Sequence, residues 1–260
     1  MGRSKGWAEA ECPKAATRFC PGPSAVGPCA ERGQLNGFEI PLYLEDVYWW
    51  AYVHPYAVRA FERQWLVNAI LWGNYPFLRD SALDALGDRL PGRTLQIACA
   101  YGDISSRLCR KVLAGSGRLD VVDALPVQLE NLRKKLPTDA PVRRLVMDSA
   151  ALDFSDASYD RAILFFLLHE QPETWRRNTL AEALRVVKPG GRIVIIDYAR
   201  PHWWNPMRYL FRPLLHSLEP FALELWRSEI ATWLPQPWAS RQLSRRSFFG
   251  GLYQQITLER

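Results

Sequence analysis

Short apolar runs alternate with helical patterns through the middle of the chain. Five runs of β-branched and apolar residues predict strands at 94–98, 119–122, 142–147, 159–168 and 192–197. Helical patterns separate these runs, and one of them spans Pro172 to Val187, just before the strand-forcing turn "KPGG". This alternation is typical of a mostly parallel sheet with crossover helices. We therefore predict an α/β, Rossmann-like core over residues 91–200.

Two aromatic segments flank the predicted core. Residues 38–90 carry aromatic and apolar residues at helical spacing after Pro55, a favourable first helical position, and predict a helical cap. Residues 201–260 are rich in Trp, Pro and Arg and end in two strand-like runs, which predict a membrane-facing helical segment followed by an antiparallel C-terminal strand. Residues 1–37 are rich in Pro, Gly and Ala without apolar periodicity, and predict a disordered leader.

Polar residues stand where the predicted strands end. The loop "QIACAYGD" follows the first strand, with Asp103 at the start of a helix. Asp123 ends the second strand, about 20 residues further on, where an acid commonly binds the hydroxyls of a ribose. Asp148 ends the third strand and Asp197 the fifth. Because parallel strands end at one edge of a sheet, we expect a ligand site there.

Composition narrows the class of partner. The net charge of +6 over 260 residues comes without a dense basic stripe or a recognition motif, so we predict no nucleic-acid partner. The longest strictly apolar run, Ala162 to Leu168, is far shorter than the roughly 20 residues of a membrane span. Four tryptophans lie between residues 49 and 72 and five between 203 and 238. Any single one is ordinary core by default, but interleaved with arginines in "RPHWWNPMRYLFRPLL" they predict a cytoplasmic protein bound peripherally to the inner membrane.

Two longer stretches resemble a known superfamily. "VMDSAALDFSDASYDRAILFFLLHE" and "LAEALRVVKPGGRIVIIDYARP" are similar to class I S-adenosylmethionine-dependent methyltransferases, in particular the branch that methylates ubiquinone and menaquinone precursors. The resemblance implies that Asp123 holds the ribose of S-adenosylmethionine and that Asp148 with its neighbours contacts the adenine. It also implies that the loop after the first strand lies along the methionine portion. The implied ligand-binding residues are Gln96, Ala98, Cys99, Ala100, Tyr101, Gly102, Asp123, Ala124, Asp148, Ser149 and Ala150.

The first loop departs from the methyltransferase pattern. Gln96 stands where that pattern has an acid that helps to hold the ligand's α-ammonium group, and Ala98 and Ala100 replace glycines. We expect these alanines to restrict the loop to ordinary backbone conformations. Together with "YWWAYVHPYAVRAFERQW", the loop resembles the methyltransferase-like family of rhodoquinone biosynthesis. That resemblance implies conversion of ubiquinone to rhodoquinone, in which an amino group from S-adenosylmethionine replaces a ring methoxy group with the help of manganese(II).

The altered loop is chemically consistent with amination. Without an anionic partner the pKa of the donor's α-amine falls, which favours the nucleophilic free amine. Candidate catalytic residues are Tyr101 in the loop, His169 after the fourth strand, and Tyr52 and His54 in the aromatic segment, although His54 is as well explained by helix entry before Pro55. Hard cations favour carboxylate and imidazole ligands, so the candidate metal ligands are His169, Glu170 and Asp197, with His202 nearby.

Two alternatives remain open. The same core would support a conventional quinone C- or O-methyltransferase, against which the weakened glycine loop counts. A non-catalytic scaffold that binds quinone or lipid is the second alternative, because a fold does not determine a function. The acids Asp123 and Asp148 favour continued nucleoside binding over the scaffold. The sequence leaves the oligomeric state open.

Overall fold

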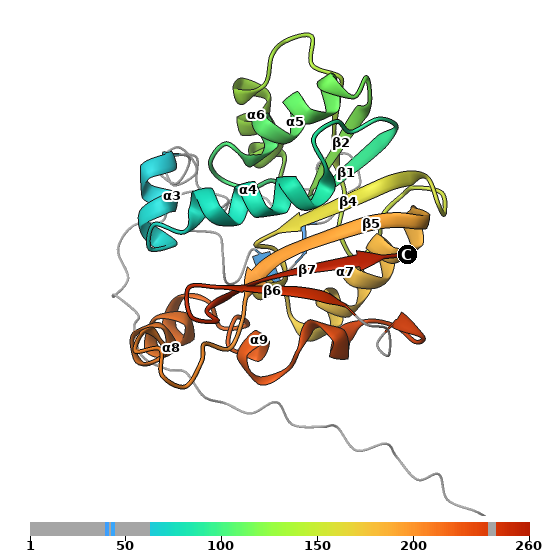
Figure 1. The fold of residues 1–260 in the computed structure, drawn as a ribbon. Helices are drawn as coiled ribbons and strands as arrows, with labels where there is room; N and C mark the ends of the chain where they lie inside the picture. The colour runs from blue at the N-terminus through green and yellow to red at the C-terminus, as the bar shows by residue number, and fades with distance from the viewer. Residues whose placement is uncertain (1–39, 42, 45–62, 239–242) are drawn as a thin grey trace, which may run out of the picture. The chain divides into compact units, whose positions relative to one another are not determined.

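The computed structural model describes residues 40–41, 43–44, 63–238 and 243–260 (Figure 1). The predicted leader and the candidate residues Tyr52 and His54 lie outside the described residues.

The described residues form a seven-stranded sheet in the order β3-β2-β1-β4-β5-β7-β6. The strands are β1 (Arg93–Ile97), β2 (Arg118–Asp123), β3 (Val142–Val146), β4 (Tyr159–Phe165), β5 (Val187–Tyr198), β6 (Ser244–Phe248) and β7 (Tyr253–Glu259). The first five run parallel to one another, and β7 is antiparallel to both β5 and β6. The mostly parallel sheet with an antiparallel C-terminal strand is therefore confirmed.

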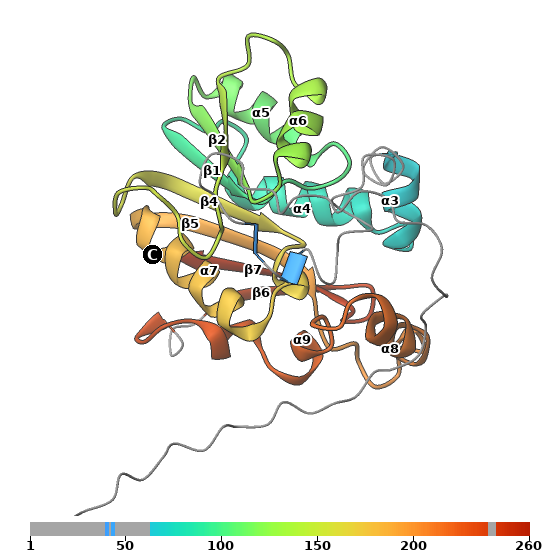
Figure 2. The same cartoon turned by 180° about the vertical axis from the view of Figure 1, so that it is seen from behind.

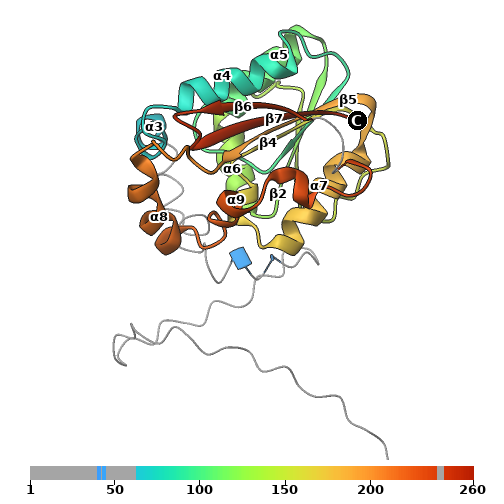
Figure 3. The same cartoon turned by 60° about the horizontal axis from the view of Figure 1, so that its bottom comes forward.

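Helices cover both faces of the sheet, as the apolar character of its central strands requires. Figure 3 shows α4 (Tyr75–Leu86) and α5 (Ile104–Ala114) on one face and α7 (Glu173–Val186) on the other. Helix α6 (Pro126–Lys135) connects β2 to β3. The centre of the sheet is closed to solvent, since Leu95, Ile163 and Val194 are at most 1% exposed. The rigid sheet fixes the positions of the loops at its carboxyl edge.

The "KPGG" segment lies inside a strand instead of preceding one. Strand β5 begins at Val187, five residues before the predicted Arg192, and it carries an irregularity in register against β4 between Tyr159 and Arg161. Gly190 adopts a φ of +76° within this irregularity. A side chain at Gly191 would lie 2.7 Å from the carbonyl oxygen of Asp160. The two glycines thus allow β5 to bulge and continue, which the prediction of a turn there did not anticipate.

Helices from the two aromatic flanks lie beyond the carboxyl ends of the strands. In Figures 1 and 2 the arrows of β4 and β5 point toward α3 (Gln64–Ile70) and α8 (Met207–Leu218). The ring of Trp72, which follows α3, lies 5.9 Å from that of Phe211 in α8. The short α9 (Glu224–Arg227) follows α8. None of the described helices is long and apolar enough to cross a membrane.

Candidate functional site

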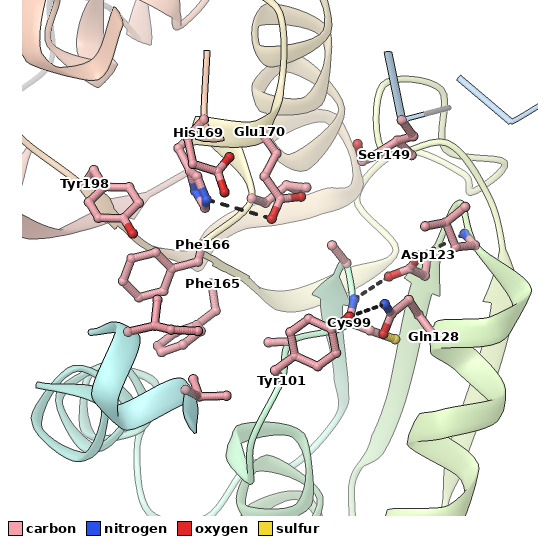
Figure 4. A pocket seen from close by; sticks show the side chains of 18 of the residues that line it. Cys99, Tyr101, Asp123, Gln128, Ser149, Phe165, Phe166, His169, Glu170 and Tyr198 are labelled. Carbon is pink, nitrogen blue, oxygen red and sulfur yellow. Dashed lines mark hydrogen bonds and ion pairs between the residues drawn. The ribbon is translucent and has the colours of Figure 1, made fainter. Parts of the chain in front are cut away.

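A cavity of about 710 Å³ opens at the carboxyl edge of the sheet. Its walls come from the residues that follow β1, β2, β3 and β4, from the end of β5, and from α3 and α8. Figure 4 shows its labelled side chains in two groups, with Asp123, Cys99 and Gln128 on one side and His169, Glu170 and Tyr198 on the other. The volume is within the range of about 300–1,000 Å³ that is common for small-molecule sites.

Asp123 lines the cavity at the end of β2. Its carboxylate accepts hydrogen bonds from the backbone N–H groups of Cys99, at 2.7 Å, and Leu125, at 2.8 Å. Burial raises the pKa of Asp123 to about 6, even though these N–H groups favour the charged form. The side chain is therefore held in one orientation, and its charge state changes near neutral pH.

The loop after β1 adopts a conformation that the alanines were expected to exclude. Ala98 has a φ of +68°, in the left-handed region that costs a residue with a Cβ roughly 1–2 kcal/mol. Its N–H donates to the carbonyl oxygen of Val122, at 2.9 Å, and its own carbonyl accepts from the side chain of Gln96, at 3.1 Å. The prediction of an ordinary backbone is wrong at Ala98, because these hydrogen bonds hold the left-handed conformation.

Gln96 supports this loop from behind. It is 1% exposed and is not part of the cavity wall. Its amide nitrogen donates to the carbonyl oxygen of Ala98 and, at 2.9 Å, to the hydroxyl of Ser105. Its amide oxygen is buried and has no hydrogen-bond partner among the described residues. The residue that replaces the expected acid is therefore neutral, fixed in orientation and retains an unused acceptor.

Tyr101 and Gly102 complete the loop. The hydroxyl of Tyr101 accepts a hydrogen bond from the side chain of Gln128, at 2.9 Å, and both residues line the cavity. Gly102 has a φ of +83°, and a Cβ there would lie 2.4 Å from the hydroxyl oxygen of Tyr75. That hydroxyl accepts hydrogen bonds from the N–H groups of Asp103 and Ile104 at the start of α5. Tyr75, which the sequence analysis did not single out, thus makes a glycine necessary at position 102.

The acid after β3 is also fixed in place. Asp148 accepts hydrogen bonds from the N–H of Ala150, at 2.8 Å, and from the indole N–H of Trp175, at 3.1 Å. The hydroxyl of Ser149 lies 3.0 Å from that of Thr179. Asp148 and Ser149 line the cavity, whereas Ala150 does not. Eight of the eleven predicted ligand-binding residues line this cavity; the three that do not are Gln96, Gly102 and Ala150.

His169 lies on the opposite side of the cavity and is paired with a buried acid. Strand β4 ends at Phe165, earlier than predicted, because Phe166 turns the chain with a φ of +55°. His169 follows in a short 3-10 turn, and its Nδ1 lies 3.0 Å from the carboxylate of Asp197. Burial lowers the pKa of His169, but the charge of Asp197 outweighs that effect and raises it to about 9. At neutral pH His169 is therefore an imidazolium in a buried ion pair.

The candidate metal ligands do not form a metal site in the described part of the chain. No group of three or more His, Cys, Asp or Glu side chains is placed there to share a metal ion. Asp197 uses its carboxylate on His169 and on the N–H groups of Leu168, at 2.8 Å, and Tyr198, at 2.8 Å. His202 is exposed, and its ring stacks on Trp204 at 5.6 Å. The described residues thus give no support for the predicted manganese(II).

Apolar and aromatic side chains make up the rest of the cavity wall. The ring of Phe166 lies 5.9 Å from that of His169 and 5.4 Å from that of Tyr198. Helix α8 contributes a row of apolar side chains at helical spacing, Phe211, Leu214, Leu215 and Leu218. This row is visible in the sequence as an i, i+3, i+4, i+7 pattern, a signal that the sequence analysis passed over. The wall from Phe165 to α8 suits a flat, apolar molecule.

The sheet order and the ligand cavity at its carboxyl edge together define the Rossmann-like class I methyltransferase fold. Comparison with known proteins agrees, since residues 94–191 match the family model described as a methyltransferase domain. An O-methyltransferase family protein from Burkholderia thailandensis aligns with a TM-score of 0.59, over 78% of this chain and 59% of that one, at 17% sequence identity. At that identity the likeness concerns the fold alone.

In sequence, the chain is similar to methyltransferases named for quinone biosynthesis. The chain is 31% identical to the ubiquinone/menaquinone biosynthesis C-methyltransferase UbiE of Ruegeria sp. over 49% of this chain and 51% of the relative. It is 33% identical to the demethylmenaquinone methyltransferase of Renibacterium salmoninarum over 55% of this chain and 56% of the relative. The chain thus matches about half the length of these curated relatives.

Proposed function

We propose that this protein transfers a group from S-adenosylmethionine to a lipid quinone bound in the 710 Å³ cavity. One observation carries the proposal: a single cavity joins a polar side, with Asp123 and Asp148, to an aromatic side that contains His169. The first side has carboxylate acceptors for the hydroxyl and amino groups of a nucleoside, and the second has the apolar walls that a quinone ring needs. The similarity to quinone methyltransferases over about half the chain supports the same assignment.

The polar side fits S-adenosylmethionine. Asp123 would accept hydrogen bonds from the ribose hydroxyls, because its carboxylate is fixed by two backbone N–H groups and lines the cavity. Asp148 and Ser149 would lie at the adenine, and the loop from Ala98 to Tyr101 would lie along the methionine portion. Bound there, S-adenosylmethionine supplies an electrophilic methyl group on its sulfonium. The residues at the other side of the cavity determine what happens to the acceptor.

Methyl transfer to the ring of a reduced quinone is the first candidate reaction. A ring carbon of the quinol forms a bond to the methyl carbon as the bond from sulfur to that carbon breaks, and the ring then loses a proton. His169 would accept this proton in its neutral form, which is a small fraction at neutral pH because its pKa is raised to about 9, and Asp197 would stabilise the resulting imidazolium. Phe166 and Tyr198 pack around the imidazole and hold its orientation. The relatives named above support this reaction over others.

Amination of ubiquinone is the second candidate, and Gln96 is the observation that favours it. Gln96 lies behind the loop and does not line the cavity, and as a neutral amide it adds no negative charge near the donor's ammonium group, as a carboxylate at this position would. The free α-amine would add to the ring carbon that bears the methoxy group, and methanol would leave with a proton from the nitrogen. The immediate product is a secondary amine that still carries the donor's α-carbon, and the amino group is transferred only when the bond between that carbon and the nitrogen is later broken. Protonated His169 would donate a hydrogen bond to the neighbouring ring carbonyl as negative charge develops on its oxygen. This role requires the imidazolium and not the neutral imidazole.

Doubly labelled S-adenosylmethionine separates the two candidates. The donor carries heavy carbon in its methyl group and heavy nitrogen in its α-amine, and the acceptors are detergent-solubilised ubiquinone and a demethylated quinol. Heavy methyl in the product establishes methyl transfer. Heavy nitrogen in a quinone that has lost a methoxy group establishes amination. If neither label reaches a quinone while calorimetry shows donor binding, the proposed transfer is wrong and the scaffold alternative is favoured.

The pH dependence of the rate tests the role of His169 in either reaction. If His169 is the base, activity rises with pH until it levels off above the pKa of about 9. If the imidazolium donates a hydrogen bond, activity falls as pH rises through the same value. His169→Gln should remove this pH dependence in both cases. A wild-type profile that stays the same in His169→Gln would exclude both roles.

We also propose that the protein acts at the surface of the inner membrane, on the cytoplasmic side. Quinones with isoprenoid tails reside in the bilayer, and the cavity wall on α3 and α8 is continuous with exposed apolar side chains. They include Trp65, Ile70, Trp72, Leu210, Leu214 and Leu218, each at least 41% exposed. Such side chains, placed at the mouth of an apolar cavity, favour peripheral insertion into the headgroup region. Loss of vesicle binding in Trp65→Ser combined with Leu214→Ser would support this orientation.

A further inference from the structure

A second cavity lies beside α8 and is surrounded by arginines. Its volume is about 400 Å³, and Arg200, Arg208, Arg212 and Arg227 all contribute to its wall. These residues come from three places in the chain, namely the segment after β5, helix α8 and helix α9. Figures 1 and 2 show α8 and α9 as neighbours. Four arginines thus line one small space, and three of them, Arg200, Arg212 and Arg227, are exposed residues.

No acid neutralises this cluster in the described part of the chain. Most of the buried or half-buried arginines elsewhere in the fold are paired with carboxylates, as Arg176 is with Glu224 at 2.8 Å. In contrast, none of the four cavity arginines forms an ion pair with a described residue. The one side-chain hydrogen bond given for the four joins Arg208 to the carbonyl oxygen of Trp203, at 3.3 Å. Four cations held close together without a counterion repel one another, which favours binding of an anion.

Trp226 lines the same cavity, but its indole N–H is closed to solvent and has no hydrogen-bond acceptor among the described residues, so it does not reach a ligand in the cavity. The guanidinium groups therefore provide the hydrogen-bond donors of this site, and an anion with several oxygens would bind to more than one of them. Arginine forks match the oxygens of a phosphate group particularly well.

Helix α8 separates the arginine cavity from the larger quinone cavity. The large cavity takes Phe211, Leu214, Leu215 and Leu218, and the small cavity takes Arg208, Tyr209 and Arg212. The apolar row and the basic row therefore lie on different sides of one helix. Tyr209 is 74% exposed and the nearby Trp203 is 81% exposed. Aromatic side chains that flank a basic site and face solvent are typical of the headgroup region of a membrane.

We propose that the arginine cavity binds the phosphate of an anionic phospholipid. The site would take the phosphodiester of one lipid while the exposed Leu210, Leu214 and Leu218 of α8 face the acyl chains, which would orient the mouth of the large cavity toward the bilayer. The proposed quinone reaction explains why such an orientation would be useful, so this purpose rests on the proposed function, whereas the phosphate site itself rests on the four arginines of the cavity wall. A free phosphate ion offers the same oxygens, so the test must separate the two sources.

The test is vesicle co-sedimentation of the full chain with two matched triple variants. The first, Arg208→Gln with Arg212→Gln and Arg227→Gln, removes three charges from the cavity wall. The control removes three charges from exposed arginines with no ion pair on α5, β2 and β3, through Arg110→Gln, Arg118→Gln and Arg144→Gln. Vesicles are phosphatidylcholine alone or phosphatidylcholine with phosphatidylglycerol. Arg212→Gln alone serves as a second variant if the triple variant folds poorly.

We expect the cavity variant to lose at least about tenfold in partitioning to phosphatidylglycerol vesicles, and the control variant to lose less than about twofold. Equal losses in both variants would show general electrostatic attraction and overturn the proposal. Tight binding of inorganic phosphate in a thermal-shift assay, without a preference for anionic vesicles, would overturn the lipid and assign the site to free phosphate. Because partitioning needs no turnover, these results are independent of whether the quinone reaction is found. Donor binding, measured by calorimetry in each variant, should stay unchanged.

Discussion

Asp123 and Asp197 both lie near the carboxyl end of a strand, but they have different roles. Each lies at or next to the carboxyl end of its strand, β2 for Asp123 and β5 for Asp197. Asp123 accepts two backbone N–H groups and still lines the cavity, whereas Asp197 is 0% exposed and uses its oxygens on His169 and the backbone around it. The comparison shows that an acid at a strand end indicates a site, while its neighbours decide whether it meets the ligand or supports a residue that does.

Removing the charge of Asp197 should have the largest effect. Asp197→Asn leaves buried His169 with only the more distant carboxylate of Glu170, 3.8 Å from its Nε2, and breaking a buried pair by removing one partner costs about 3–5 kcal/mol. Urea unfolding at pH 7 measures this loss. The raised pKa of His169 also means that the ion pair adds stability below its ordinary pKa of 6.5, and that this stability is lost as pH rises through about 9. In Asp197→Asn this loss of folding stability between pH 6.5 and about 9 should disappear. If the stability of the variant fell with pH as steeply as that of the wild type, the ion pair with Asp197 would not be its cause.

Removing the charge of Asp123 should instead affect the ligand. Asp123→Asn is expected to weaken binding of S-adenosylmethionine about 100-fold, because losing a charged acceptor costs roughly 1.5–3 kcal/mol per hydrogen bond. Isothermal titration calorimetry measures the affinity, and Asp153→Asn, at an exposed position after β3, is the matched control. Unfolding stability should change much less than in Asp197→Asn. If the affinity for S-adenosylmethionine fell equally in Asp123→Asn and Asp197→Asn, the two acids would not have separate roles.

A change of pH should give a smaller effect in the same direction. Because the pKa of Asp123 is raised to about 6, lowering the pH to 5 leaves roughly one side chain in eleven ionised. Donor affinity should therefore fall about tenfold between pH 7.5 and pH 5. Titrations across this range in wild type and in Asp123→Asn measure the effect. The variant should show a flat profile, and a parallel decline in both proteins would assign the pH dependence to another group.

The ends of the strands could be predicted from the sequence, because the spacing of apolar residues and the polar residue that follows each apolar run are local signals. Asp123 and Asp148 both follow apolar runs, and the parallel register brings them to the same cavity. The contacts that shape the first loop were not accessible, because they join distant residues. Tyr75 meets Asp103 and Gln128 meets Tyr101 across helices, and no spacing rule connects such pairs. The left-handed Ala98 was mispredicted for the same reason, since the hydrogen bonds that hold it involve Val122 and Gln96.

The candidate catalytic residues differ in how far the sequence alone could predict their surroundings. His169 was found because it follows an apolar strand, but its ion pair with Asp197 depends on β4 and β5 being neighbours in the sheet. The arginine cavity depends on helix α8 packing beside α9, and the sequence alone showed only arginines interleaved with aromatic residues. Tyr52 and His54 remain predictions, because they lie outside the described residues.

The place of β7 in the sheet also constrains how the chain can reach its native state. β7 lies between β5 and β6, although it follows both in the sequence. During synthesis, β5 must therefore keep an open edge of backbone hydrogen-bonding groups until residues 253–259 have left the ribosome, and β6 has no β7 to pair with before then. Pairing between such distant segments is slow, and an exposed strand edge can pair with another chain. The yield of folded protein in cells should therefore depend on how quickly this last strand is inserted.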